Sequence, residues 1–314
     1  MLKHVLDVVE LLDSPNTSGA VLAEHLKSFA GADGAEITVE TVTGEQGHTD
    51  FVTVVVAGSA GKRSGGSAPT LGVIGRLGGV GARPELVGYV SDGDGAAAAL
   101  AVAAKLLDMH AKGDVLPGDV IVSTHVCGWA PTQPHHPVPF MNSPVDMRTM
   151  NEHEVSDEMD VVLSIDTTKG NRVINHRGIA LSPTVKQGWI LKVSDDLIDV
   201  VETVTGEHAR TYPITMQDIT PYGNGVQHIN SILQPAVATS APVVGLAITA
   251  QTAVAGCATG ASHEVDIALA ARVAVETAKR LGAGSLRFHD ADEFDRLVSL
   301  YGSMTQLQSA PETA

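Results

Sequence analysis

The chain has 314 residues, of which 44% are hydrophobic and 18% charged, and its formal net charge at pH 7 is −16. This length and composition can bury a large core, which excludes a disordered chain and favours one sizeable α/β domain. The acidic balance excludes nucleic acid and anionic membranes as expected partners, and no apolar stretch reaches the roughly 20 residues that cross a bilayer. We therefore expect a cytoplasmic protein whose ligand is a small molecule or a short peptide.

Hydrophobic periodicity predicts the elements of the first half. Apolar residues at helical spacing predict amphipathic helices, and β-branched runs bounded by turn residues predict strands. A long segment rich in Pro, Gly, Asn and His predicts an irregular loop, which compact domains usually keep for a function. In chain order these are helices over 2–12 and 18–29, a hairpin of strands over 36–42 and 51–57, a strand over 71–74, a helix over 96–109, a strand over 119–124 and the loop over 128–144.

The second half continues the alternation of strands and helices. In chain order we expect strands over 160–165 and 188–193, a helix over 196–205, a strand over 243–249 and a helix over 265–281. Alternating strands and helices favour a three-layer α/β/α sandwich with a largely parallel mixed sheet. We expect a single α/β domain over 1–307 and a disordered tail over 308–314.

Acidic side chains follow two apolar, strand-like runs. Asp92 and Asp94 stand on a Ser-Asp-Gly-Asp-Gly turn before a helix, where they could bind an ion or simply form an Asx turn and a helix cap. Asp166 directly follows an apolar run, and its burial would be costly without a cation or several hydrogen-bond donors. Because the carboxyl ends of neighbouring parallel strands converge on one crevice, we expect these acids to become neighbours.

Imidazoles and thiols occupy comparable positions. His125 and Cys127 lie two residues apart at a strand end, so both can project to one face as metal ligands. The alternative is a buried, apolar-like cysteine and a hydrogen-bonded histidine. His263 and Glu264 immediately precede the last long helix. Further candidates in polar or glycine-rich segments are His135, Asn224, His228 and Cys257.

Four segments resemble one known family. They are residues 72–79, 166–172, 217–225 and 256–264. On these segments nearly the whole chain resembles the bacterial family called domain of unknown function 1177. The resemblance is specific, and it implies no activity.

The order of elements is also similar to that of the co-catalytic zinc aminopeptidases of the glutamyl and deblocking type. The similar features are two opening helices joined at Ser18-Gly19, the acidic turn at Asp92, the Asp-x-Thr strand end at Asp166 and a histidine, His263, before the last long helix. The resemblance implies a zinc-exopeptidase-like fold, a homo-oligomer and a metal-activated water.

Two departures from the aminopeptidase pattern alter the expected centre. Arg76 stands where the first metal-binding histidine should fall, and His125 and Cys127 stand where a Glu-Glu pair should fall. The resemblance then implies a single divalent metal, zinc or else manganese or cobalt, held by Asp92, Asp166 and His263. His125 or Cys127 would complete the shell or act as base.

These residues support three hypotheses of function. The leading one is a metal-dependent hydrolase of a small amide, peptide or cyclic amide, with His125 and Cys127 as catalytic residues and Arg76 as a bidentate partner of a substrate carboxylate. His228 and Asn224 would also contact substrate, and the secondary site candidates are Asp94, Cys257, Glu264 and His135. The second hypothesis is a cofactor-independent racemase or epimerase that uses Cys127 and Cys257 as a base and acid pair. The third is a small-molecule binder without catalysis.

Overall fold

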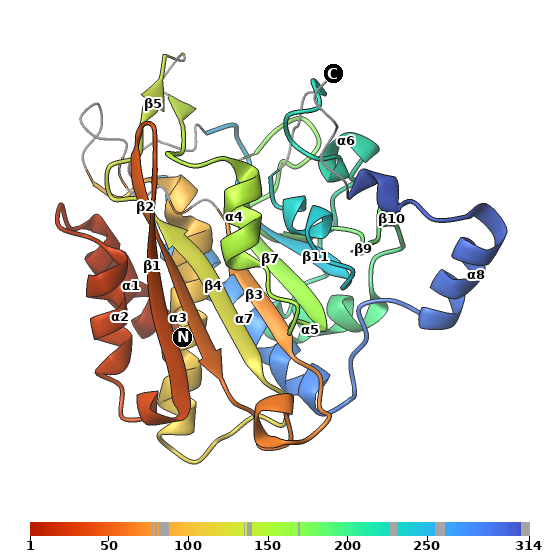
Figure 1. Ribbon diagram of the computed structural model, residues 1–314, viewed down its shortest axis with the longest axis horizontal. Helices are drawn as coiled ribbons and strands as arrows, with labels where there is room; N and C mark the ends of the chain where they lie inside the picture. The colour runs from red at the N-terminus through yellow and green to blue at the C-terminus, as the bar shows by residue number, and fades with distance from the viewer. Residues whose placement is uncertain are drawn as a thin grey trace.

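A mixed β-sheet forms the centre of the protein, and helices pack on both of its faces (Figure 1). The computed structural model describes residues 1–76, 78, 81, 88–134, 136, 140–168, 170–226, 231–254 and 261–308. Strands follow the order β1-β2-β4-β3-β7-β11-β9-β10, and β8 also pairs with β11. These strands are β1 (Ala35–Gly44), β2 (Gly47–Val56), β3 (Leu71–Gly75), β4 (Val120–Val126), β7 (Val161–Thr168), β8 (Gly178–Leu181), β9 (Val185–Lys186), β10 (Trp189–Ile190) and β11 (Val243–Thr249). Two short strands, β5 (Thr132–Gln133) and β6 (Phe140–Met141), pair separately.

The helices divide between the two faces of the sheet. One face carries the long helices α1 (Leu2–Asp13), α2 (Gly19–Lys27), α3 (Asp94–His110), α5 (Asp195–Thr205) and α7 (Glu264–Gly282). The other face carries α4 (Met147–Glu154), α6 (Met216–Ile219) and the 3-10 turn η4 (Gln234–Val237). Helix α8 (Ala291–Tyr301) lies at one end of the molecule (Figure 1). The remaining 3-10 turns are η1 (Ala32–Gly34), η2 (Lys62–Ser64), η3 (Ser91–Gly93) and η5 (Thr305–Leu307).

Alternation along the strands separates two apolar cores. In β3, Leu71 and Val73 belong to the large core beneath α3, whereas Ile74 belongs to the core on the opposite face. In β7, Leu163 and Val162 divide in the same way. This follows from the two-residue period of a strand, whose successive side chains point to opposite faces. Both faces are apolar, which explains why the strands read as continuous hydrophobic runs.

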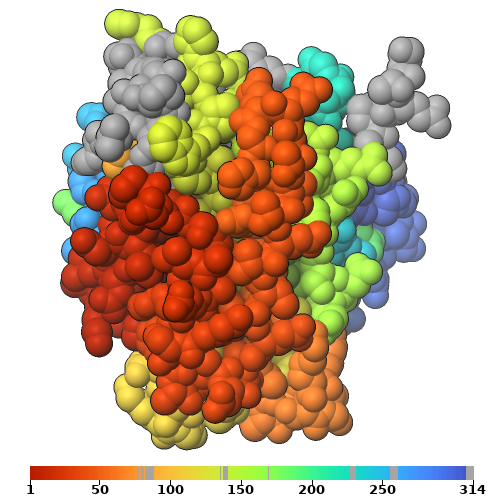
Figure 2. All heavy atoms as spheres, turned by 60° about the vertical axis from the view of Figure 1, so that its left-hand side comes forward, coloured from red at the N-terminus to blue at the C-terminus, as the bar shows by residue number. Residues whose placement is uncertain are grey.

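The four central strands β4, β3, β7 and β11 are parallel, so their carboxyl ends lie at one edge. Antiparallel strands flank them, since β2 pairs antiparallel with β4 and both β8 and β9 pair antiparallel with β11. The β1–β2 hairpin closes one side of the sheet, where it runs along the surface beside α1 and α2 (Figure 2). The sheet is therefore mixed, with a parallel centre.

Helix α3 begins against the carboxyl edge of the sheet. Almost all of its residues are buried, and its run of alanines keeps the helix close to β3, β4 and β7. A side chain at Gly95 would meet backbone atoms of both Arg76 and Ile165. The close approach at Gly95 therefore brings the acidic turn before α3 to the ends of β3 and β7.

Most predicted elements are confirmed, with small shifts at their ends. The confirmed elements are the helices that became α1, α2, α3, α5 and α7 and the strands that became β1, β2, β3, β4, β7 and β11. A mixed α/β fold with a largely parallel mixed sheet is confirmed with them.

Two predictions of secondary structure are wrong. The segment 188–193 was expected to be a buried strand, but only Trp189–Ile190 pairs, at the sheet edge and half buried. The loop over 128–144 contains the β5–β6 pair. Helices α4, α6 and α8 were not predicted.

At the C-terminal end, Gln308 donates from its side-chain nitrogen to the carbonyl oxygens of Ala236 (3.0 Å) and Thr239 (2.6 Å). The rest of the expected tail lies outside the described residues. None of the helices in the described ranges combines the length and the apolar content needed to cross a bilayer.

Replacing Gly95 by alanine should lower the free energy of unfolding by about 2 kcal/mol, because the loss from overpacking exceeds the gain in helix propensity. The new methyl group would lie 2.5 Å from the Arg76 carbonyl oxygen and 2.6 Å from that of Ile165. Urea denaturation measures the difference. Gly113→Ala is the control: its φ is +78° but its surroundings are open, so we expect a loss of only about 1 kcal/mol. A Gly95→Ala protein no less stable than this control would contradict the packing argument.

Candidate functional site

Three polar side chains project from neighbouring parallel strands toward the face that carries α4. The residues directly before Arg76, His125 and Asp166 pair in register across β3, β4 and β7. Each lies an odd number of positions from the residues of its own strand that fill the core beneath α3. Its side chain therefore points to the opposite face of the sheet. The register and the alternation together therefore bring a guanidinium, an imidazole and a carboxyl group to one edge and one face of the sheet.

Glu154, the last residue of α4, contacts two of these side chains. Its Oε2 lies 3.3 Å from Nη1 of Arg76, and its Oε1 lies 2.5 Å from Nδ1 of His125. The side chains of Arg76 and Glu154 have no exposed surface. Arg76 also donates from Nη2 to Oδ1 of Asn151 and from Nη1 to the sulfur of Met147, at 3.0 Å. One face of α4 is thus built around a buried arginine.

The hydrogen bonds of His125 fix its tautomer. The backbone N–H of Gly78 donates to Nε2 at 3.0 Å, so Nε2 carries no hydrogen and Nδ1 donates to Glu154. His125 is therefore a neutral imidazole with both ring nitrogens bonded inside the protein. A role for His125 as general base stays a prediction, and it requires one of these bonds to break.

Asp166 is 1% exposed and accepts two hydrogen bonds. Its Oδ1 accepts from the backbone N–H of Thr167 and its Oδ2 from the hydroxyl of Ser231, both at 2.7 Å. Burial, and then the charge of Asp92, raise the pKa of Asp166 to about 8, against the opposing effects of these hydrogen bonds and of Arg76. Asp166 thus holds a proton at neutral pH, and Asp92 lies near enough to interact with it electrostatically.

Asp94 joins the first turn of α3 to the start of α7. It is fully buried, and its Oδ1 accepts from the hydroxyls of Ser262 (2.5 Å) and Tyr89 (3.2 Å). Burial and the charge of Asp94 raise the pKa of Tyr89 well above its ordinary value, so this phenol stays protonated. His263, the N-cap of α7, and Glu264, its first residue, follow directly and are half buried. Two helix N-termini, where backbone N–H groups lack partners, therefore meet at this edge.

Cys127 lies in a small apolar cluster with Val90, Ala130 and Met141. It is 4% exposed, and its thiol donates to the carbonyl oxygen of His48 at 3.4 Å. Burial raises the pKa of the thiol to about 11. Cys127 is thus a protonated thiol at neutral pH, and its predicted catalytic role would need an activating change in its surroundings.

The other predicted residues are placed as follows. Both terminal nitrogens of Arg76 already have protein partners, so contact with a substrate carboxylate would require those contacts to change. Asn224 accepts from the backbone N–H of Val226 at 2.9 Å in a turn. His135, His228 and Cys257 lie outside the described residues. Among the residues that the structure describes, no three His, Cys, Asp or Glu side chains converge as ligands of one metal ion.

Sequence reasoning missed four residues that complete this edge. Glu154 and Asn151 hold Arg76, Ser231 binds Asp166, and Tyr222 interacts electrostatically with Asp166. Tyr222 is 40% exposed, and burial together with the charge of Asp166 raises the pKa of its phenol. A signal for the α4 residues existed in the sequence. Asp146 is a helix N-cap, and Met147, Asn151 and Glu154 follow at the spacing of one helical face.

Comparison with known proteins places the chain in a family. The family model described as protein of unknown function (DUF1177) matches residues 40–311. The chain belongs to this family. The match covers β2 through η5 and every edge residue described above. No curated protein matches the chain, and the resemblance to zinc aminopeptidases gains no support from these comparisons.

Glu154→Gln should lower the free energy of unfolding of this DUF1177 protein by about 3–5 kcal/mol, because the charge of Arg76 would stay buried without a carboxylate. The double variant Arg76→Met/Glu154→Gln removes both charges, so its loss should fall short of the sum of the two single losses by at least about 1 kcal/mol. Urea denaturation provides both values. Glu152→Gln, on the exposed side of α4 with a surface ion pair to Arg148, is the control and should change stability by less than about 1 kcal/mol. Equal effects of the two Glu→Gln changes would contradict the buried pair.

Cys127 should resist alkylation by iodoacetamide in the folded protein near neutral pH, since with a pKa of about 11 only about one thiol in ten thousand is ionised at pH 7. Mass spectrometry of peptides distinguishes Cys127 from Cys257. We expect labelling of Cys127 after unfolding in guanidinium chloride, or above about pH 10. Labelling of the folded protein at the rate of a free cysteine would restore Cys127 as a thiolate nucleophile or base.

Proposed function

We propose that this protein is a metal-dependent hydrolase of a small amide, peptide or cyclic amide, with Asp92 and Asp166 as carboxylate ligands. One observation carries the proposal. A fully buried aspartate at the end of a central parallel strand lies within electrostatic reach of a second aspartate, beside the first turn of α3. A buried carboxyl group near a second acid needs a cation or a proton, and the carboxyl edge of an α/β sheet is where ligands bind.

The oxygen atoms at the carboxyl edge of the sheet supply some, but not all, of the ligands that a divalent cation needs. Each oxygen of Asp166 accepts one hydrogen bond, from Thr167 or Ser231, and so keeps a lone pair for a cation. The charge of Asp92 raises the pKa of Asp166, so a second carboxylate lies within electrostatic range. His263 is the third ligand that the aminopeptidase resemblance implies, although no cluster of three such residues is present within the described ranges. The resemblance in the order of elements is the reason to propose zinc, with manganese or cobalt as substitutes.

The side chains around the two aspartates would have different roles in hydrolysis. A bound divalent ion supplies Lewis acidity and a water of lowered pKa. Tyr222, partly exposed and protonated at neutral pH, offers an O–H donor for the substrate carbonyl. The Arg76–Glu154–His125 network binds the backbone N–H of Gly78.

The alternative functions receive less support. A two-cysteine racemase needs one thiol to act as base, and the buried Cys127 has a pKa of about 11. A non-catalytic binder is an outcome of the experiment below.

Calorimetric titration of chelator-treated protein with Zn²⁺, Mn²⁺ or Co²⁺ tests the metal, and a panel of N-acyl amino acids, dipeptides and cyclic amides tests hydrolysis. We expect turnover only with metal, and Asp166→Asn should lower kcat/KM by on the order of 100-fold or more. This variant should fold, because at neutral pH the protonated carboxyl of Asp166 already resembles an amide in shape and charge.

The matched control is Asp157→Asn, at an exposed position before β7, which should keep both metal binding and activity. A folded protein that binds none of the three ions, or whose metal affinity is the same after Asp92→Asn and Asp166→Asn, would rule out the proposed centre. Metal binding at these residues without turnover of any substrate class would refute the hydrolase and favour the binder.

A further inference from the structure

A cavity of about 380 Å³ lies among the start of β8, the end of α5 and the first turns of α7. Its volume is within the range of small-molecule sites in proteins. Gly178, which lines the cavity, pairs with Thr249, the last residue of β11. The cavity therefore lies beside the carboxyl edge of the sheet.

One part of the cavity wall is cationic. Arg177 and Arg210 both line it, in a chain whose net charge is −16. Arg177 is held by Asp266, with Nε 3.1 Å from Oδ2, and the Asp266 side chain is only 6% exposed. Arg210 is exposed and has no ion-pair partner among the residues that the structure describes. The guanidinium of Arg210 is thus available to an anion, and a carboxylate matches its fork of donors.

The rest of the wall combines apolar side chains with the polar residues Thr205, Glu207 and His208. Ile179 and Val201 are buried behind the cavity, and Leu269 of α7 is half buried beside them. Val265, in the first turn of α7, lines the cavity with 55% of its surface exposed. The apolar part of the wall, beside an arginine that has no ion-pair partner in the described ranges, suits a ligand that has an anionic end and a short hydrocarbon body.

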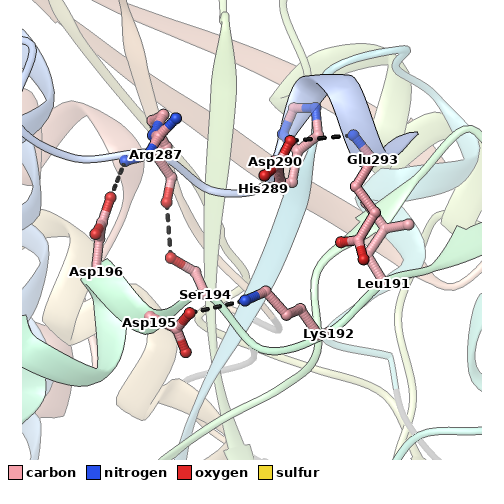
Figure 3. A pocket seen from close by; sticks show the side chains of 9 residues that line it. All are labelled: Leu191, Lys192, Ser194, Asp195, Asp196, Arg287, His289, Asp290 and Glu293. Atoms are coloured by element: carbon pink, nitrogen blue, oxygen red, sulfur yellow. Dashed lines mark hydrogen bonds and ion pairs between the residues drawn. The ribbon is translucent and has the colours of Figure 1, made fainter. Parts of the chain in front are cut away.

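A second cavity shows the contrast. It is about 150 Å³ in volume and lies between the start of α5 and the segment before α8 (Figure 3). Its polar groups bond to one another, as when Lys192 donates to Asp195 at 2.7 Å and the backbone N–H of Arg287 donates to Asp196 at 2.7 Å (Figure 3). The contact between Arg287 and Asp196 joins α5 to the chain that leads into α8. In the larger cavity Arg210 has no ion-pair partner among the described residues, although the carboxylate of Glu207 also lines the wall.

We propose that the cavity between β8, α5 and α7 binds a small carboxylic acid with an aliphatic body, whose carboxylate pairs with Arg210. The aliphatic body would pack against Ile179, Val201 and Leu269. The turn of α7 that carries Val265 also follows Ser262, whose hydroxyl binds Asp94 at the candidate site. A ligand in the cavity would thus contact the first turn of α7, next to the serine that binds Asp94. The proposal does not depend on the hydrolase activity, since its test measures binding alone.

Thermal unfolding and calorimetric titration of the full chain with hexanoate test the proposal. Hexanoate should raise the melting temperature in a saturable manner, and hexanamide, hexylamine and inorganic phosphate should bind at least about tenfold more weakly, because each lacks either the carboxylate or the hydrocarbon body. Arg210→Gln should weaken hexanoate binding about tenfold or more. Arg296→Gln, an exposed arginine on α8, is the matched control and should leave the affinity unchanged.

Val265→Trp provides a second variant, because the exposed position tolerates a larger side chain that would fill the cavity. It should abolish hexanoate binding without lowering the melting temperature of the free protein. Arg177 is not a suitable target, since its removal would leave Asp266 buried without a partner. No saturable binding of hexanoate up to about 10 mM, unchanged affinity after Arg210→Gln or Val265→Trp, or equal stabilisation by phosphate or hexylamine would overturn the proposal.

Discussion

The buried ion pair between Arg76 and Glu154 is the interaction on which the carboxyl edge of the sheet depends. A guanidinium without exposed surface loses all of its hydration, and only a well-placed carboxylate with further acceptors compensates for that loss. Glu154 is the last residue of α4, and Asn151 from the preceding turn adds a second acceptor. The helix must therefore lie over β3 and β4 and end where it does, or the charge of Arg76 has no partner.

The same pair orders the chain that leaves β3. Because Glu154 binds Nδ1 of His125, the other ring nitrogen faces the backbone N–H of Gly78. The carbonyl oxygen of Gly78 in turn accepts from the backbone N–H of Cys127 at 2.9 Å. A side chain at position 78 would overlap the backbone of His125, so only glycine allows this approach. One buried carboxylate thus sets the position of two strand ends and a helix.

The sequence was sufficient for the parts of the fold that depend on local patterns, and insufficient for those that depend on pairing. Apolar runs and helical stripes identified the central strands and long helices, and the rule that parallel strand ends converge predicted that His125 and Asp166 lie at one edge. No local sequence pattern predicted that Arg76 would be fully buried and paired with Glu154. That contact spans 78 positions and joins the end of a strand to a helix of largely polar sequence. The prediction of a strand over 188–193 was wrong for a related reason. The apolar residues of this segment cover an edge of the sheet instead of filling its centre.

The charge of Arg76 is not enough to bring the pKa of Asp166 down to its ordinary value. Arg76 lowers the pKa of Asp166, yet burial and Asp92 still raise it to about 8. The reason is that the single positive charge of Arg76 is already compensated by Glu154 at 3.3 Å and cannot also neutralise two aspartates. Near neutral pH, Asp166 therefore keeps its proton unless a further cation lies close to it. The pair that organises this edge therefore leaves Asp166 without a compensating positive charge, and the divalent cation proposed above would supply one.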